Sequence, residues 1–265
     1  MPFTLNNGNR VYWEEHGKGE PVLLIMGLGY TLDMWHRTSP LLSRHYRVIL
    51  FDNRGVGRSD CPAGPYSIAG MAGDAAAVLD AAGCDRVHAF GVSMGGMIAQ
   101  ELALNYPKRV KSLILGCTAA GGPEAVRAEP EVLLALGARA LMTPEEGVQA
   151  MVPFIYDRST PRERIDEDLE IRMRTFPKSE TYLAQMAGIM DFEAYSRLDR
   201  LSVPTLVIHG ENDRLVPPGN GELISNRIPG ARLVLLKNAS HIFITDQELE
   251  SHKTIMGFLA EVSNE

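Results

Sequence analysis

One strand-to-helix turn constrains the fold of this chain more than any other stretch, and its sequence is Gly91-Val92-Ser93-Met94-Gly95. Residues 86–91 are typical of a short buried strand, and from Met94 the apolar residues recur at helical spacing. A serine on so sharp a turn has a strained backbone, and side chains two residues before and after it would collide, which accounts for both glycines. The turn also aims a helix N-terminus at the serine hydroxyl, which favours developing negative charge there. The pattern predicts a reactive serine; an ordinary serine in a glycine-rich turn is the alternative interpretation.

Buried strands alternate with helices through residue 118 and again after residue 200. Several of the strands are apolar on both faces, as in the middle of a parallel sheet. This alternation predicts an α/β fold with a mostly parallel sheet of about eight strands, flanked by helices. The sequence places strands at residues 10–16, 22–26, 47–51, 86–91, 110–115, 203–208 and 231–236, and helices through residues 34–42, 67–82 and 247–262.

The sequence pattern changes between residues 119 and 200, where no strand is expected and charged residues are more frequent. Thr143-Pro144-Glu145-Glu146 and Thr160-Pro161-Arg162-Glu163 both have the form of a capping box with proline at the first helical position. Helices are expected near residues 130–142, 144–152, 161–176 and 179–192. The sequence therefore predicts a helical insertion, or lid, after the sixth strand, between core segments 1–118 and 201–265.

Apolar side chains of this insertion are expected mostly to pack on the core, and a few to line an adaptable pocket, because methionine fits irregular shapes. Further pocket positions are expected near the serine and in the loops that follow the strands. The expected pocket residues are Gly27, Tyr30, Met142, Phe154, Met186, Met190 and Ile242.

Composition limits the partners of the chain. Its 33 acidic and 26 basic residues give a formal net charge of -7, which argues against nucleic acid or anionic membranes as partners. The N-terminal residues lack the features of a secretory signal, and no apolar run is long enough to span a bilayer. Cys61, Cys84 and Cys117 form an odd set without paired spacing, which favours reduced thiols and a cytoplasmic location. No metal or cofactor is expected.

A strand followed by Gly27-Leu28-Gly29, a helix and a second strand ending in Asp52 is also similar to a dinucleotide site. Leu32 stands where that fingerprint has its third glycine, so we keep this interpretation only as an alternative. The polar loop at residues 52–59 is expected to brace neighbouring loops, with Asp52 and Arg54 in structural roles.

A serine hydroxyl needs a base within hydrogen-bond reach, and a histidine base needs a carboxylate to fix its tautomer. Parallel sheets gather such groups at the carboxyl ends of their strands. Asp213 follows one late strand and His241 follows the next, so both can meet above Ser93. His209, at the end of a strand, is the rival base, whereas Asp246 is interpreted as a helix N-cap.

The order Ser93, Asp213, His241 is the order of an α/β-hydrolase triad. Over its whole length, lid included, the chain resembles the α/β-hydrolase family, through the serine turn, the loop at 52–59 and the segments 209–217 and 238–241. The resemblance implies an oxyanion hole formed by the backbone N–H groups of Leu28 and Met94. Relatives commonly carry His-Gly where this chain has Met26-Gly27, but backbone donors do not depend on that side chain.

The resemblance implies a serine hydrolase that cleaves a carboxylic ester through an acyl-enzyme. The loop at residues 26–29 and the surroundings of Ser93 are similar to 3-oxoadipate enol-lactonase-like and aclacinomycin methylesterase-like hydrolases. A small or medium, partly apolar ester or lactone is therefore the expected partner, and the chain is expected to be a monomer or homodimer. A lactonase, a cofactor-free haloperoxidase or perhydrolase, a carbon–carbon bond hydrolase and a slow-turnover ligand sensor are the alternatives.

Overall fold

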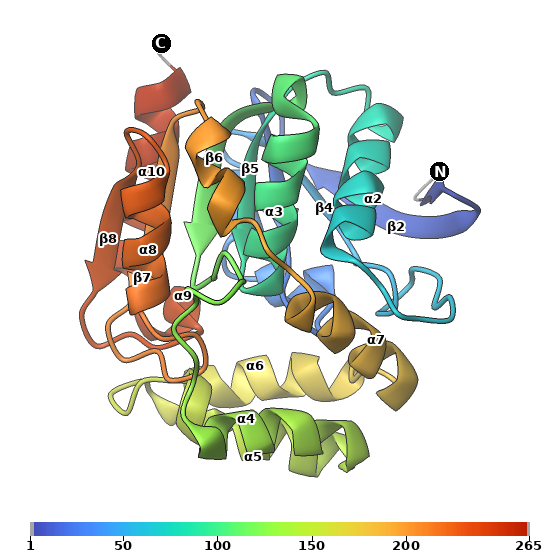
Figure 1. The fold of residues 1–265 in the computed structure, drawn as a ribbon, viewed down its shortest axis with the longest axis vertical. Helices are drawn as coiled ribbons and strands as arrows, with labels where there is room; N and C mark the ends of the chain where they lie inside the picture. The colour runs from blue at the N-terminus through green and yellow to red at the C-terminus, as the bar shows by residue number, and fades with distance from the viewer. Residues whose placement is uncertain (1–2, 264–265) are drawn as a thin grey trace.

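The computed structural model describes residues 3–263, which contain an eight-stranded sheet in the order β1-β2-β4-β3-β5-β6-β7-β8 (Figure 1). Neighbouring strands from β4 to β8 are parallel, whereas β2 pairs antiparallel with both β1 and β4. The predicted α/β fold with a mostly parallel sheet is confirmed. The strands are β1 (Phe3–Asn6), β2 (Asn9–His16), β3 (Pro21–Ile25), β4 (Arg47–Phe51), β5 (Val87–Val92), β6 (Val110–Gly116), β7 (Thr205–Gly210) and β8 (Arg232–Leu236).

Helices cover both faces of the sheet, because the central strands are apolar on both sides. In β3, Leu23 and Ile25 belong to one buried cluster, and Val22 and Leu24 belong to the cluster on the opposite face. The first face is covered by α2 (Ile68–Ala81), α3 (Met94–Asn105) and α8 (Gly219–Arg227); the second is covered by η1 (Leu32–Trp35), α1 (Ser39–Leu42), α9 (Phe243–Asp246) and α10 (Glu248–Ser263). Among residues 3–263, no helix combines the length and apolar character needed to cross a membrane.

Two N-terminal features differ from the sequence-based expectation. Strand β1 was not anticipated, although Asn7-Gly8 is a strong two-residue hairpin signal and both residues have positive φ, 50° and 81°. The single helix expected through residues 34–42 is instead the pair η1 and α1. A continuous helix would need a backbone N–H at Pro40, which proline lacks.

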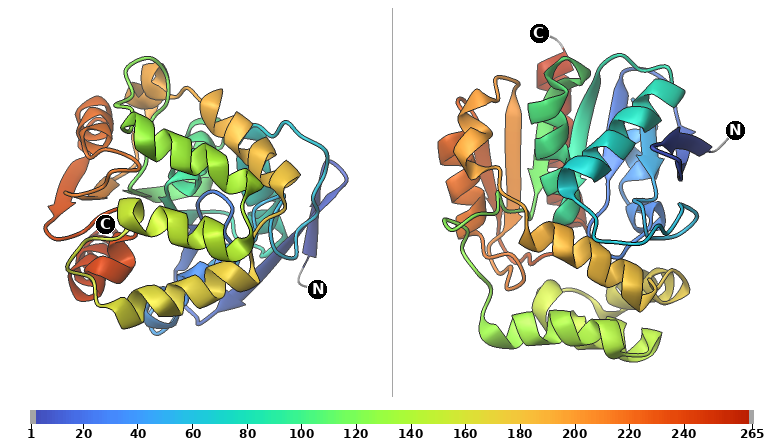
Figure 2. Two further views of the ribbon diagram at one scale, coloured as in Figure 1. Left: turned by 90° about the horizontal axis from the view of Figure 1, so that it is seen from below. Right: turned by 45° about the vertical axis from the view of Figure 1, so that its right-hand side comes forward.

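Four longer helices lie between β6 and β7: α4 (Pro130–Ala138), α5 (Pro144–Ile155), α6 (Arg162–Arg174) and α7 (Ser179–Met190). In Figure 1, α4, α5 and α6 form a layer below the carboxyl ends of the strands, and the view from below in Figure 2 shows all four helices in front of the sheet. Shorter 3-10 helices, η2 (Pro107–Arg109), η3 (Arg139–Leu141) and η4 (Tyr195–Arg200), complete the chain. Helices α5 and α6 share a third buried apolar cluster that includes Met151, Ile155 and Leu169.

One of the two expected capping boxes forms. Thr143 Oγ1 accepts a hydrogen bond from Glu146 N, and the Glu146 carboxylate accepts one from Thr143 N. At the start of α6, the N-cap is Pro161, and Thr160 Oγ1 instead donates to Asp246 Oδ1 at 2.6 Å. The second box was therefore a wrong prediction, because a buried carboxylate outside the helix takes the threonine hydroxyl.

The turn between β5 and α3 packs against β3 so closely that Gly95 cannot carry a side chain. A Cβ added at Gly95 would lie 2.1 Å from Ile25 O. We expect Gly95→Ala to lower the free energy of unfolding by about 1–3 kcal/mol or more, measured by chemical denaturation. Gly257→Ala in α10 meets no atom within 4 Å and should raise it by about 0.5–1 kcal/mol. Wild-type stability of Gly95→Ala would contradict this packing.

Candidate active site

Ser93 lies at the sharp turn between β5 and α3 with φ 55° and ψ −124°, a conformation that L residues rarely adopt. Added Cβ atoms explain the flanking glycines, since one at Gly91 would lie 2.1 Å from Gly95 O. The turn is held by Ser93 N, which donates to Gly116 O at 2.8 Å, and by Thr118 Oγ1, which donates to Ser93 O at 2.7 Å. The strained backbone that the sequence predicts is thus fixed by the neighbouring strand β6.

The loops after β7 and β8 bring an aspartate and a histidine together. His241 Nδ1 lies 2.8 Å from Asp213 Oδ2, and both side chains are buried. Asp213 Oδ1 accepts the backbone N–H groups of Leu215 and Val216 at 2.9 and 2.8 Å. Burial alone would raise the pKa of Asp213, but the charge of His241 and hydrogen bonds from His209 and His241 outweigh it and lower that pKa. An ionised Asp213 accepts the proton on Nδ1, so Nε2 is the unprotonated nitrogen of a neutral His241.

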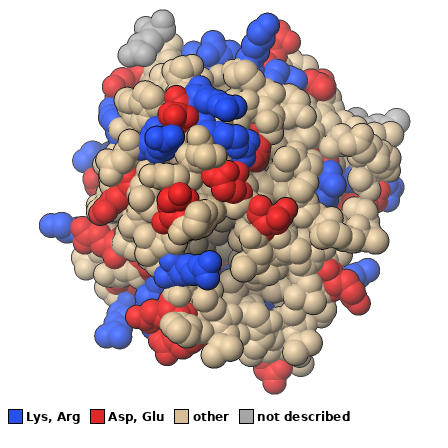
Figure 3. All heavy atoms as spheres, viewed as in Figure 1, with Lys and Arg blue, Asp and Glu red and all other residues tan. Residues whose placement is uncertain are grey.

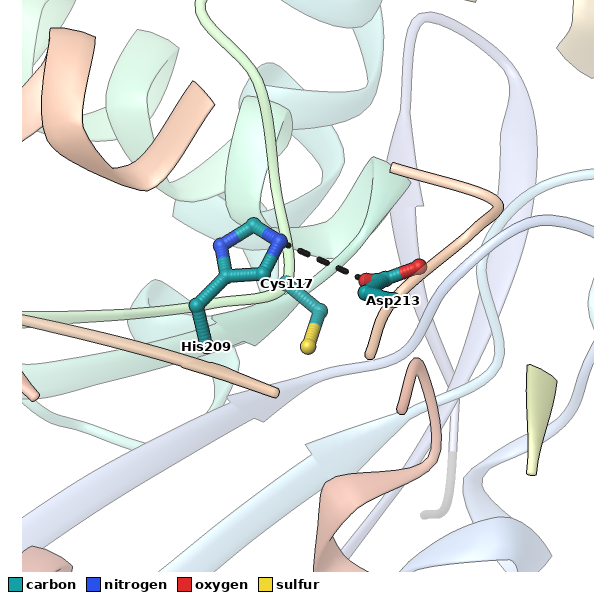
Figure 4. A group of neighbouring side chains, drawn as sticks. All are labelled: Cys117, His209 and Asp213. Atoms are coloured by element: carbon teal, nitrogen blue, oxygen red, sulfur yellow. Dashed lines mark ion pairs between the residues drawn. The ribbon is translucent and has the colours of Figure 1, made fainter. Parts of the chain in front are cut away.

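A second histidine, His209, also faces the Asp213 carboxylate, and Figure 4 shows these two side chains with Cys117 beside them. His209 Nε2 is 2.8 Å from Val216 O, to which it must donate, and 3.4 Å from Asp213 Oδ2. Potential ligand atoms of Cys117, His209 and Asp213 lie within 4.8 Å of one another, which resembles a metal site. Burial raises the pKa of the Cys117 thiol far above its usual value, and the carboxylate is already engaged in hydrogen bonds. This set therefore suits a hydrogen-bonded support for the loops and not a metal ion.

Ser93 and His241 open into one cavity of about 200 Å³ between the sheet and the inserted helices. A hollow is visible on this side of the molecule near the middle of Figure 3, and charges of both signs are interspersed around it. No hydrogen bond joins Ser93 to His241 within residues 3–263, although both residues line the cavity. The cavity is lined by Met26, Gly27, Leu28, Tyr30, Val92, Ser93, Met94, Met97, Leu133, Leu136, Arg139, Met151, Ile155, Arg172, Met186, Ile189, Met190, Leu215, Val216, His241 and Ile242.

The expected pocket residues Gly27, Tyr30, Met186, Met190 and Ile242 are among these, and two others are not. Phe154 packs against the guanidinium of Arg214, whose carbon lies 5.0 Å from the centre of the ring. Met142 follows η3 at the start of the turn that leads into α5 and is half-buried there. Both were assigned to the pocket from residue type alone, which does not fix the face of a helix.

Among the residues that the structure describes, the backbone N–H groups of Leu28 and Met94 at the cavity have no hydrogen-bond acceptor and are free to bind a ligand oxygen. The loop that carries Leu28 is braced by side chains that the sequence analysis did not assign to the site. Gln185 Oε1 in α7 accepts Gly29 N at 2.8 Å, and Asn53 Nδ2 donates to Met26 O at 2.8 Å. These amides brace the loop that contains Met26 and Gly27.

The loop after β4 has the bracing role expected for it. Asp52 Oδ1 accepts Leu32 N at 2.9 Å, and Arg54 pairs with the buried Asp74. Hydrogen bonds from Leu32 and Arg58 therefore already use both oxygens of the Asp52 carboxylate. The alternative dinucleotide interpretation needs this carboxylate to bind a ribose, and it is not free to do so.

Asp246 is not a helix N-cap as expected. It ends α9, and its carboxylate accepts a hydrogen bond from Ser240 N at 2.7 Å, next to His241.

Sequence reasoning also missed Arg139 and Arg172, which line the cavity from the inserted segment. Their relative exposure is 2% and 1%, so they are buried cations. Nothing in the local sequence marks them, because an arginine side chain is ordinarily solvated.

A sequence model described as "alpha/beta hydrolase fold" matches residues 20–247. The chain belongs to the α/β-hydrolase family. This assignment confirms the resemblance inferred from the serine turn and from the order of the three candidate residues, and it makes the chain a hydrolase.

Individual relatives of this α/β-hydrolase differ in what they act on. A protein of Azorhizobium caulinodans, assigned by inference as carbamate hydrolase RutD, is 34% identical over 99% of both chains. The poly(3-hydroxyalkanoate) depolymerase of Ectopseudomonas oleovorans is 32% identical over 91% of this chain and 84% of its own length. The enol-lactonase of Burkholderia xenovorans has a TM-score of 0.87 and 29% identity, covering 98% of this chain and 100% of its own.

Replacing Gln185 should destabilise the protein, because Gln185 Nε2 also donates to Arg54 O at 2.8 Å. Gln185→Ala leaves that carbonyl and Gly29 N–H unpaired in a buried site, and we expect a loss of about 1–3 kcal/mol in the free energy of unfolding. Urea denaturation measures it, with the exposed Glu180→Ala of the same helix as control. Equal stability of the two variants would show that Gln185 does not brace the loop.

Burial raises the pKa of Asp246 to about 6. An unfolded aspartate has a pKa near 3.9, so between about pH 4 and pH 6 the folded state holds a proton that the unfolded state has released. Stability contributed by this group therefore falls as pH rises through that window, by at most about 3 kcal/mol. Relative to Asp246→Asn, the wild-type protein should lose stability from pH 4 to pH 6. Parallel stability curves for the two proteins would contradict the raised pKa.

Proposed function

We propose that this α/β-hydrolase is a serine hydrolase that cleaves a carboxylic ester through an acyl-enzyme, with Ser93, His241 and Asp213 as the triad. The observation that carries the proposal is the 2.8 Å contact between His241 Nδ1 and Asp213 beside the cavity that Ser93 also lines. A carboxylate on Nδ1 sets the tautomer in which Nε2 can accept a proton. The positive φ of Ser93 supports the same role, since strain of this kind persists where the surroundings enforce it.

In this mechanism, His241 Nε2 accepts the proton of Ser93 Oγ as the oxygen attacks the ester carbonyl. The N–H groups of Leu28 and Met94 stabilise the negative charge on the carbonyl oxygen. The imidazolium then protonates the leaving alcohol. Water, deprotonated by His241, attacks the acyl-enzyme and releases the acid and free Ser93.

The cavity supports a small or medium substrate with an apolar part, because most of its wall is leucine, isoleucine, valine and methionine. We propose that the segment at residues 119–200 acts as a lid, since its residues supply the side of the cavity opposite Ser93. A lactone is the second candidate, favoured by the likeness to the enol-lactonase. Cytoplasmic location and a monomeric or homodimeric state remain predictions.

Labelling with a fluorophosphonate and hydrolysis of short acyl esters test the triad together. Ser93→Ala and His241→Ala should lose labelling and reduce kcat by about 10⁴-fold or more. Asp213→Asn should reduce kcat by about 10⁴-fold, because Nδ1 loses the acceptor that fixes its tautomer. The exposed His16→Ala and Ser196→Ala are matched controls and should behave as wild type. Undiminished hydrolysis by Ser93→Ala would overturn the proposal.

A substrate panel separates the remaining alternatives. Lactones and carbamates belong in it because the names of the relatives include an enol-lactonase and a carbamate hydrolase. Halogenation that requires acetate and peroxide would indicate a perhydrolase, and cleavage of diketones would indicate a carbon–carbon bond hydrolase. Tight ligand binding with negligible turnover would indicate a sensor.

A further inference from the structure

The substrate cavity holds two cations that no carboxylate neutralises. Arg139 and Arg172 line it with relative exposures of 2% and 1%. Within residues 3–263, neither forms an ion pair. Arg139 Nε and Nη2 and Arg172 Nε also lack any hydrogen-bond acceptor in this part of the chain. Buried charges are normally paired, so two unpaired guanidinium groups need an explanation.

Aromatic rings compensate the two charges only in part. The guanidinium carbons of Arg139 and Arg172 lie 4.9 and 4.4 Å from the centre of the Tyr30 ring. Arg139 also lies against Phe176 and Tyr182, and Arg172 Nη1 donates to Tyr156 Oη at 3.2 Å. A cation–π contact contributes about 0.5–2 kcal/mol, less than the several kcal/mol that a buried ion loses in desolvation. Accordingly, burial lowers the pKa of Arg139, and it lowers that of Arg172 to about 9.

The acidic group linked to this pair is committed elsewhere. Asp168 Oδ2 accepts hydrogen bonds from Tyr156 Oη at 3.0 Å and Thr245 Oγ1 at 2.7 Å, so Tyr156 separates it from Arg172. Asp168 Oδ1 lies 3.5 Å from the guanidinium of Arg37 and 3.4 Å from His36 Nε2. Asp168 therefore pairs with Arg37. Arg139 is not linked to any carboxylate, even through a tyrosine, in the part of the chain that the structure describes.

The cations lie next to the proposed oxyanion hole. A Cβ added at Gly29 would be 3.2 Å from Arg139 Nη1, so this guanidinium packs against the residue that follows Leu28. Arg172 Nη2 donates to the hydroxyl of Tyr30, one residue further along the same loop. A ligand whose carbonyl oxygen reaches Leu28 N–H can place a second group on these arginines across a short chain.

From this juxtaposition we infer that the substrate is anionic: an ester or lactone whose free carboxylate, a few carbons from the scissile carbonyl, binds Arg139 and Arg172. The inference rests on the proposed function and specifies its substrate class. A carboxylate matches the planar fork of a guanidinium, and the apolar wall accommodates the carbons between the two ends. The arginines act as specificity-determining residues and take no part in bond making.

Monomethyl glutarate carries the free carboxylate that the inference concerns, whereas in dimethyl glutarate a second methyl ester replaces it. For the wild-type enzyme, kcat/KM should be at least about tenfold higher with the monoester, because the diester leaves both cations unpaired. Arg139→Met and Arg172→Met should each reduce this ratio about tenfold or more. Arg174→Gln, exposed on the same helix as Arg172, is the matched control and should keep the wild-type ratio.

Glutarate binding can be measured without turnover, and glutaramide is its neutral control. The measurement therefore separates the proposed carboxylate site from the proposed esterase activity. Calorimetry should detect glutarate binding to wild type and at least tenfold weaker binding to Arg139→Met. Wild-type hydrolysis of the diester as fast as the monoester, with no preference for glutarate, would overturn the inference and leave the esterase intact. Arginine-dependent glutarate binding without hydrolysis of either ester would support the anion site and count against the esterase.

If Arg139→Met fails to fold, Arg139→Lys replaces it. Lysine keeps the positive charge and loses the planar fork, so both the ester ratio and glutarate affinity should still fall. Unchanged values in a folded Arg139→Lys, together with unchanged values in Arg172→Met, would exclude the proposed carboxylate site.

Discussion

The close approach of α3 to the end of β3 is the contact on which the rest of the site depends. Gly95 lies so near Ile25 O that even a methyl group would overlap it. Ile25 ends β3 and leads directly into the loop that carries Leu28, whereas Gly95 follows the turn that carries Ser93. One packing contact therefore sets the position of the serine relative to both backbone N–H groups of the proposed oxyanion hole. The strained backbone at Ser93 persists because α3 and β3 pack too closely for the turn to adopt another conformation.

Much of this arrangement could be predicted from the sequence, because it depends on local rules. The glycines two residues either side of Ser93 indicate a turn that side chains would block, and doubly apolar strands such as 22–26 indicate a parallel sheet. Parallel strands end at one edge, so the loops that contain Asp213 and His241 were expected to meet there. Each of these inferences uses neighbours in sequence or the direction of the strands.

Features that depend on how the inserted helices pack could not be predicted in the same way. Gln185 and Arg139 have ordinary helical surroundings in the sequence and become part of the site only because α7 lies against the Leu28 loop and η3 borders the cavity. Thr160 has the sequence of an N-cap, yet its hydroxyl bonds to Asp246, which lies 86 residues away. Met142 and Phe154 are apolar residues of the kind expected in a pocket, yet neither lines the cavity. Local sequence determines whether a segment forms a helix, but tertiary contacts determine which of its side chains line the cavity.

Gln185 links the inserted helices to two loops at the carboxyl edge of the sheet, and this link has a mechanical consequence. Its side chain spans α7, Gly29 N–H and Arg54 O, so it is bonded to the loop of Leu28 and to the loop after β4 at once. An outward displacement of α7 would break both bonds and release the Leu28 loop. In the proposed mechanism, a movement that opens the cavity would therefore also misplace Leu28 N–H, and the return of α7 would restore it.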